Sequence, residues 1–264
     1  MTQASAASPG GPAVERELLD YAVGLARDAG AMTLQWFGRR ELAVQTKPDG
    51  TPVTDADRRA ERWIRQRLAR DHPEDGIIGE EEGPAEVATA KRWIIDPIDG
   101  TKAFVRGVPL YSTLLAYDDE HGPAVGVIVL PALDQAVWAG RGCGCWFDDQ
   151  RTGVSGTTRV ADAYVMSSSF SHWDEAALLA VKRAGASLRT WGDGFGYALV
   201  ATGRADAMID PQVRLYDVAA MPIILAEAGG RFTSLDGDPS PDAGSGMATN
   251  AHIHDELLAL MAVA

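Results

Sequence analysis

Apolar residues recur at helical spacing near the start of the chain. Their period of three to four residues predicts an amphipathic helix from Val14 to Phe37, which Gly38 ends. A second helix is predicted over Asp55–Asp71, because Thr54 is a good N-cap and acids stand in the first turn. The segment between them, Lys47–Pro52, is rich in turn residues, so we expect a loop there.

Short apolar runs bounded by turn residues follow this second helix and predict strands. The run Gly76–Gly79 passes into an acidic loop, and the run Lys91–Ile95 is expected to end as a strand at Pro97. Further strands are predicted over 110–116, 124–131, 135–147, 163–168, 207–210, 232–234 and 246–249, and further helices over 173–184, 194–202, 217–228 and 254–261. Strands and helices interleave without a strict βαβ period, which predicts a layered α+β or α/β fold rather than a barrel.

A polar, glycine-containing stretch at 148–156, DDQRTGVSG, is a candidate boundary within the chain. We therefore expect an N-terminal α+β half over 13–152, which carries most of the candidate acids, and a C-terminal α/β half over 153–264 that completes a cleft. Residues 1–12 are small, polar and rich in Gly and Pro, and we expect them to form a disordered tail. A length of 264 residues suits one large domain or two intimate ones.

Charge and composition narrow the range of partners. The formal net charge of −13 argues against nucleic acid, because a phosphate backbone needs a basic face. No run is long and apolar enough for a membrane span, and the N-terminus lacks the basic and apolar regions of a signal peptide, so we expect a cytoplasmic protein without membrane partners. The two cysteines, Cys143 and Cys145, fit small residues in a tight turn better than a soft-metal site.

The stretch DPIDGT at 96–101 places two acids at the end of a buried strand. Pro97 restricts the turn between Asp96 and Asp99, so both carboxylates and the Ile98 carbonyl can face one point. Carboxylate and carbonyl oxygens are hard ligands that suit Mg²⁺, and the N–H groups that follow Gly100 suit an anion. A surface turn with an N-cap explains the same residues, and the residue types alone leave the two interpretations about equal.

Three further groups of acids favour a functional interpretation. Glu80 begins a run of three glutamates after a strand, and Asp217 opens an otherwise apolar helix. Asp55 and Asp57 both stand at a helix start, where capping of the helix dipole is the alternative role, and for Asp57 we favour capping. Several acids in apolar surroundings are costly unless cations compensate them.

These motifs together resemble the inositol monophosphatase family of Mg²⁺-dependent, lithium-sensitive phosphatases. GEE at 79–81, WIIDPIDGT at 93–101 and YDVAA…EAGG at 216–230 occur in the family's order, with TKPDGTPVTDAD at 46–57 upstream. The resemblance extends from about Val14 to the end of the chain. DPIDGTKAFVRGVP, RTWGD and DPQV are most similar to the histidinol-phosphatase type within the family.

The resemblance implies an αβαβα sandwich, a homodimer and a set of site residues. Mg²⁺, or Mn²⁺ as a substitute, would occupy two to three sites, and Glu80 and Thr101 would position and deprotonate the attacking water, with Asp55 beside a third ion. The implied metal ligands are Glu80, Asp96, the Ile98 carbonyl, Asp99, Asp217 and Asp55. The implied substrate-binding residues are Gly100, Thr101, Lys102, Arg189, Asp210 and Asp217.

Three departures from the family pattern leave the substrate open. Ala103 replaces a common asparagine, Tyr216 a usual tryptophan and Asp210 a usual glutamate. The substrate implied is a small phosphate ester, L-histidinol phosphate, whose ammonium Asp210 could bind. Inositol-1-phosphate or a broader set of sugar phosphates is the alternative within the enzyme class. A non-catalytic regulator that binds Mg²⁺ and a phosphorylated ligand is the alternative outside it.

Overall fold

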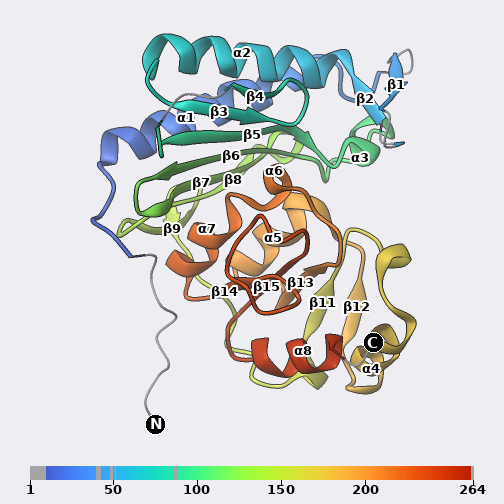
Figure 1. The fold of residues 1–264 in the computed structure, drawn as a ribbon. Coiled ribbons are helices and arrows are strands. Elements are labelled where there is room, and N and C mark those ends of the chain that lie inside the picture. The colour runs from blue at the N-terminus through green and yellow to red at the C-terminus, as the bar shows by residue number, and fades with distance from the viewer. Residues whose placement is uncertain (1–9, 40–42, 48–49, 51, 86–88, 263–264) are drawn as a thin grey trace.

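Two β-sheets with helices between and outside them form the structure (Figure 1). The computed structural model describes residues 10–39, 43–47, 50, 52–85 and 89–262, and the statements below concern these residues. The larger sheet has eight strands, in the spatial order β10 (Gln150–Arg151), β9 (Gly144–Phe147), β8 (Gln135–Gly140), β7 (Gly122–Leu130), β6 (Ser112–Asp119), β5 (Arg92–Asp99), β3 (Gly76–Gly79) and β4 (Gly83–Ala85). Its neighbouring strands are antiparallel, except that β3 and β5 run parallel.

The smaller sheet has five strands and is formed by the later part of the chain. Their spatial order is β12 (Ser187–Arg189), β11 (Tyr164–Met166), β13 (Ala207–Asp210), β15 (Gly246–Thr249) and β14 (Arg231–Thr233). The strand β11 runs parallel to both of its neighbours, and the other pairs are antiparallel. A separate two-stranded hairpin, β1 (Val44–Thr46) and β2 (Pro52–Thr54), precedes the larger sheet.

Helices cover both faces of each sheet, so the layers run αβαβα (Figure 1). The helices α1 (Arg16–Thr33) and α2 (Asp55–Asp71) pack on the outer face of the larger sheet. The helices α5 (Asp193–Ala201) and α7 (Met221–Ala228) lie between the sheets, and α4 (Glu175–Arg183) and α8 (His254–Met261) cover the outer face of the smaller one. This arrangement confirms the predicted layered fold.

The central strand β5 shows how the sequence pattern produces two cores. Its successive side chains point to opposite faces of the sheet, as the pleat requires. Ile94 packs into the core shared with α5 and α7, whereas Trp93 and Ile95 pack against α1 and α2. All three are at most 1% exposed, which explains why the run Trp93–Ile95 is continuously apolar instead of alternating with polar residues.

The prediction that this strand ends at Pro97 is wrong, because β5 continues to Asp99. Its register against β6 shifts between Asp96 and Asp99, so the proline sits at an irregularity where no ladder hydrogen bond from its nitrogen is needed. The Thr113 hydroxyl donates to the Pro97 carbonyl at 2.8 Å and holds the irregular segment against β6. The strand therefore carries both acids of the DPID motif at its end.

Two predicted helices also differ from the structure. The helix predicted over 217–228 is divided into α6 (Leu215–Val218) and α7, with Pro222 in the first turn of α7. The first helix ends at Thr33, four residues before the predicted end. The predicted boundary at 148–156 contains β10, the last strand of the larger sheet along the chain, and precedes β11, the first strand of the smaller one.

The segment before α1 is held by the larger sheet. Arg141 donates to the Pro12 carbonyl at 2.7 Å, and its own carbonyl accepts from the Val14 N–H at 2.9 Å. The predicted tail therefore extends less far than residue 12, and its first nine residues lie outside the described part. Among the described residues, no helix is long and apolar enough to cross a membrane.

Candidate metal and phosphate site

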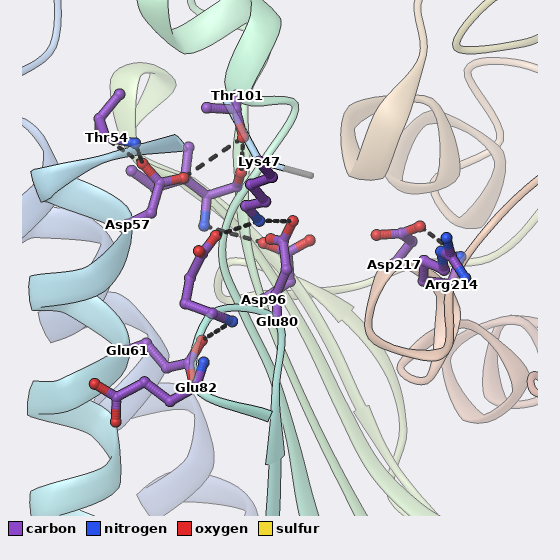
Figure 2. Close-up of polar contacts among 12 residues, drawn as sticks. Lys47, Thr54, Asp57, Glu61, Glu80, Glu82, Asp96, Thr101, Arg214 and Asp217 are labelled. Carbon is purple, nitrogen blue, oxygen red and sulfur yellow. Dashed lines mark hydrogen bonds and ion pairs between the residues drawn. The ribbon is translucent and has the colours of Figure 1, made fainter. Parts of the chain in front are cut away.

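Three acids from two elements, β5 and α6, converge at the end of β5. One carboxylate oxygen from each of Asp96, Asp99 and Asp217 lies within 4.8 Å of the other two. Asp96 and Asp99 are 2% and 8% exposed at the end of β5, and Asp217 comes from α6 across the cleft. Figure 2 shows the Asp217 carboxylate pointing toward the acids of the larger sheet. The motif DPID and the acid of YDVAA are thus brought together as the sequence predicted.

Local hydrogen bonds aim these three carboxylates. The Ile98 N–H donates to the Asp96 carboxylate at 3.1 Å, across the irregular turn. The Ser112 hydroxyl donates to Asp99 at 2.6 Å, and the backbone N–H of Gly194 donates to the same oxygen. The Arg214 N–H donates to Asp217 at 2.7 Å and fixes it at the first turn of α6.

Burial and mutual repulsion make ionisation of this cluster unfavourable without a cation. Burial, followed by the charges of neighbouring acids, raises the pKa of Asp96 and of Asp99 well above the ordinary range of a carboxyl. The pKa of Asp217 is raised to about 7, mainly by burial. A divalent cation would reverse this balance, and hard carboxylate oxygens are the ligands that Mg²⁺ and Mn²⁺ prefer. The residues present therefore fit a bound divalent metal ion.

Glu80 adjoins this cluster and is held by a lysine. The Lys47 ammonium lies 2.7 Å from Glu80 and 2.6 Å from Glu81, and these three side chains form one polar group beside Asp96 (Figure 2). Burial raises the pKa of the Glu80 carboxyl, and Lys47 partly offsets this effect. Glu61 accepts from the N–H groups of Glu81 and Glu82 at 2.7 and 3.1 Å, which fixes the acidic loop against α2.

The structure places Asp57, rather than Asp55, beside Thr101. Asp55 is exposed at the first residue of α2, and among the described contacts it has no hydrogen bond to the site. Asp57 is fully buried, and the Thr101 hydroxyl lies 3.5 Å from one of its oxygens (Figure 2). Burial raises the pKa of Asp57 to about 6. Residues two apart on a helix point to nearly opposite sides, so only one of the two acids can face the cleft.

Asp57 also caps α2, which explains why the sequence favoured a purely structural role for it. Its second oxygen accepts from the N–H and the hydroxyl of Thr54, at 2.8 and 2.5 Å. The signal that could have identified its position is the capping box itself, because the acid in the third helical position turns back toward the residue that precedes the helix. The Asp57 carboxylate can therefore cap α2 through one oxygen and face Thr101 with the other.

The phosphate-binding turn begins at Gly100, before the short helix α3 (Thr101–Val105). Gly100 has φ 81°, which favours glycine, and a β-carbon there would lie 2.9 Å from an oxygen of Asp193. The Thr101 hydroxyl lies 3.1 Å from the Ile98 carbonyl, so the implied carbonyl ligand faces the same region. Lys102 is exposed at the start of α3. The binding of an anion by the N–H groups of this turn stays a prediction.

The two remaining substrate-binding candidates are engaged within the protein. The Asp210 carboxylate is 5% exposed and accepts from the Ser168 N–H and hydroxyl, the Ser167 hydroxyl and the Tyr197 hydroxyl, at 2.8 to 3.3 Å. Arg189 is exposed and lies over the rings of Tyr164 and Trp191, 5.3 and 5.7 Å from their centroids. Among the described contacts, Arg189 donates only to a backbone carbonyl, that of Leu188.

Sequence reasoning missed one acid that borders the cleft. Asp193, the first residue of α5, lies against Gly100, and burial and the charge of Asp210 raise its pKa. The motif RTWGD is similar to the histidinol-phosphatase type, but the sequence predicted no role for its acid, whose position follows from its contact with Gly100.

Comparison with known proteins agrees with this geometry. The model of the inositol monophosphatase family matches residues 14–263. The chain is 44% identical to a histidinol-phosphatase of Mycobacterium tuberculosis, over 91% of this chain and 96% of the relative. It is 42% identical to one of Streptomyces coelicolor, over 89% and 92%.

A solved structure supports the same assignment. The structure of the Thermotoga maritima IMPase TM1415 superposes with a TM-score of 0.85 at 30% identity, covering 93% of this chain and 96% of that one. The match in sequence, fold and arrangement of acids leads to one conclusion: the chain belongs to the inositol monophosphatase family.

Proposed function

We propose that the protein is a metal-dependent phosphoric monoester hydrolase that converts L-histidinol phosphate to L-histidinol. The observation that carries the chemistry is the cluster of Asp96 and Asp99, both buried, and Asp217, half-buried, whose oxygens lie within 4.8 Å of one another. The choice of substrate rests on the two similar proteins that are named histidinol-phosphatases.

Mg²⁺ is the metal that this donor set fits, in two or three sites, with Mn²⁺ as a substitute. Asp96, Asp99, Asp217, Glu80 and the Ile98 carbonyl would hold it. Bound there, Mg²⁺ would neutralise the charge of the phosphate and make water a better nucleophile near neutral pH. This charge balance is how a chain with a net charge of −13 can accept an anionic ester.

Thr101 and Asp57 are the protein groups best placed to orient and deprotonate the attacking water. The Thr101 hydroxyl lies 3.5 Å from Asp57 and 3.1 Å from the Ile98 carbonyl, so it can accept from water while it donates to one of them. A carboxyl with a pKa of about 6 is mostly ionised at neutral pH and still basic enough to take a proton. We therefore add Asp57 to Thr101 and Glu80, which the resemblance implied as the groups that activate the water, and Asp57 replaces Asp55 as the acid of α2 that faces the site.

The phosphate would lie at the start of α3, where Gly100, Thr101 and Lys102 present backbone N–H groups. The positive φ of Gly100 turns this backbone toward the acids of β5. The ester would lie between this turn and Asp217, whose carboxylate lies near those of Asp96 and Asp99. Arg189 would lie farther out, where its guanidinium covers two exposed aromatic rings.

Initial rates on three phosphate esters test the proposal directly. L-histidinol phosphate, inositol-1-phosphate and fructose-1,6-bisphosphate would be compared with Mg²⁺ and with EDTA. We expect Mg²⁺-dependent phosphate release with the highest kcat/KM on L-histidinol phosphate. A higher kcat/KM on inositol-1-phosphate would make the protein an inositol-phosphate phosphatase, and no release from any ester would make it a non-catalytic binding protein.

Three further predictions from the resemblance stand beside this proposal. We expect a homodimer, which light scattering coupled to size-exclusion chromatography would measure. We expect a cytoplasmic protein, which fractionation of the source cells would test. We also expect inhibition by Li⁺, measured as loss of the Mg²⁺-dependent rate.

A further inference from the structure

We propose that Asp193 binds the ammonium group of the substrate and that Asp210 only positions Asp193. This inference rests on the proposed function, because an ammonium is what distinguishes L-histidinol phosphate from a sugar phosphate. It reassigns the contact that the sequence suggested for Asp210. The inference follows from a comparison of the two carboxylates: that of Asp210 accepts four hydrogen bonds from the protein, and that of Asp193 lies beside Gly100.

The carboxylate of Asp210 is already satisfied by the protein. It accepts from Ser168 through both the N–H and the hydroxyl, and from the hydroxyls of Ser167 and Tyr197. A carboxylate with four such partners and 5% exposure would have to give up protein hydrogen bonds to contact a substrate. Asp210 therefore organises the Ser167–Ser168 segment beneath the cleft.

Ser168 connects this acid to Asp193. Its hydroxyl accepts from the Asp193 N–H at 2.8 Å, while it is also 3.0 Å from the Asp210 carboxylate. The link holds Asp193 at φ 53°, a left-handed conformation that aspartate adopts more readily than most residues. The chain maintains this uncommon backbone geometry at the first residue of α5, and the geometry determines where the side chain points.

The carboxylate of Asp193 points toward the reacting end of the site. One of its oxygens would lie 2.9 Å from a β-carbon at Gly100, at the start of the phosphate-binding turn. The next residue, Gly194, donates its N–H to Asp99, so Asp193 adjoins the metal-binding cluster as well. Within the described part of the chain, no ion pair engages this carboxylate, Ser168 is the one side chain in hydrogen-bonding contact with it, and the charge of Lys102 on α3 acts on it.

The chemistry of L-histidinol phosphate matches this position. The carbon that bears its ammonium is bonded to the carbon of the phosphate ester, so a carboxylate that receives the ammonium must lie beside the phosphate site. Asp193 lies there, and Asp210 lies behind it. A charge-assisted contact in a partly buried site is stronger than a neutral hydrogen bond and discriminates against substrates without the amine.

A comparison of two substrates and two carboxylates tests the assignment. kcat/KM would be measured with saturating Mg²⁺ on L-histidinol phosphate and on its des-amino analogue, imidazolylpropyl phosphate, for the wild type, Asp193→Asn and Asp210→Asn. We expect Asp193→Asn to lower kcat/KM on L-histidinol phosphate by about 10- to 100-fold and on the analogue by less than about 3-fold. Asp210→Asn should lower both by a similar factor, because it acts through Ser168.

A second variant separates the charge from the backbone conformation. Asp193→Gly accepts the same positive φ without strain, so it should keep the thermal stability of the wild type and lose the same selectivity for the amine. Equal losses on both substrates in Asp193→Asn and Asp193→Gly would overturn the inference, as would an amine-selective loss confined to Asp210→Asn. Wild-type enzyme that prefers the sugar phosphates over L-histidinol phosphate would instead overturn the proposed function, and with it this inference.

Discussion

Replacing Asp96 by asparagine should change stability in opposite directions with and without metal. Asp96 is 2% exposed and lies within 4.8 Å of both Asp99 and Asp217. Asparagine has nearly the same shape and keeps an oxygen for the Ile98 N–H, so the variant removes a charge without opening a cavity. The protein without metal should therefore gain stability from a change that removes its activity.

The magnitude follows from the separation of the charges. Two carboxylates about 4.8 Å apart repel by about 3.5 kcal/mol at an effective dielectric constant of about 20, and the substitution removes two such pairs. The wild type relieves part of this repulsion by binding protons, since the pKa values of Asp96 and Asp99 are raised. We therefore expect Asp96→Asn to increase the free energy of unfolding by about 2–4 kcal/mol in EDTA at about pH 8.

Saturating Mg²⁺ should reverse this order. With Mg²⁺ at about 1,000 times its dissociation constant, one site stabilises the folded wild type by about 4.1 kcal/mol, which offsets the variant's gain of about 2–4 kcal/mol, and the variant loses a ligand shared by the acidic cluster. We also expect kcat to fall by more than about 100-fold. Urea denaturation of both proteins, with EDTA and with Mg²⁺, measures the two differences. The reasoning is refuted if Asp96→Asn is less stable than the wild type in EDTA, or if Mg²⁺ stabilises both proteins equally.

Three further predictions concern the water-activating pair, a buried histidine and a turn. Asp57→Asn and Thr101→Ala should each lower kcat by about 100-fold or more, and the double variant should lower it little further if the two act as a unit, which steady-state kinetics would show. His254 lies between two buried threonine hydroxyls, and burial lowers its pKa to about 4. The unfolded chain binds this proton below about pH 6.5, whereas the folded chain does not, so the free energy of unfolding should fall as the pH is lowered. Relative to a His254→Gln variant, we expect the loss to be about 2 kcal/mol at pH 5, measured by urea denaturation. Glu227 accepts from the N–H groups of Gly142 and Gly144 at 2.7 Å each, so Glu227→Ala should lower the free energy of unfolding by about 1–3 kcal/mol, measured by the same denaturation.

Elements with strong local signals could be predicted from the sequence almost to the residue. The helix α2 has the predicted bounds because Thr54 and Asp57 form a capping box at its start. The strands β13 and β15 and the helix α8 also have the predicted bounds. The strands that were missed, β1, β4, β10 and β12 among them, have two or three residues. Such short strands depend on a pairing partner, so their own residues carry little signal.

The candidate site was predictable where acids follow an apolar strand or open an apolar helix. Asp96, Asp99 and Asp217 are of this kind, and the structure brings them together. Asp57 and Asp193 were not predictable in the same way, because each occupies a position that an acid also takes for purely local reasons. Only their tertiary neighbours, Thr101 in one case and Gly100 in the other, show that they face the cleft.

The distribution of these residues along the chain has a consequence for how such an enzyme can diversify. On the proposed function, the acids of β5 and the turn of α3 would contact the part common to every phosphate ester, whereas Asp193 on α5 and Arg189 on β12 would border the variable alcohol. Mutations confined to residues 187–193 could thus alter which alcohol is accepted while hydrolysis itself is retained. Laboratory evolution toward a new substrate would best begin with this short segment.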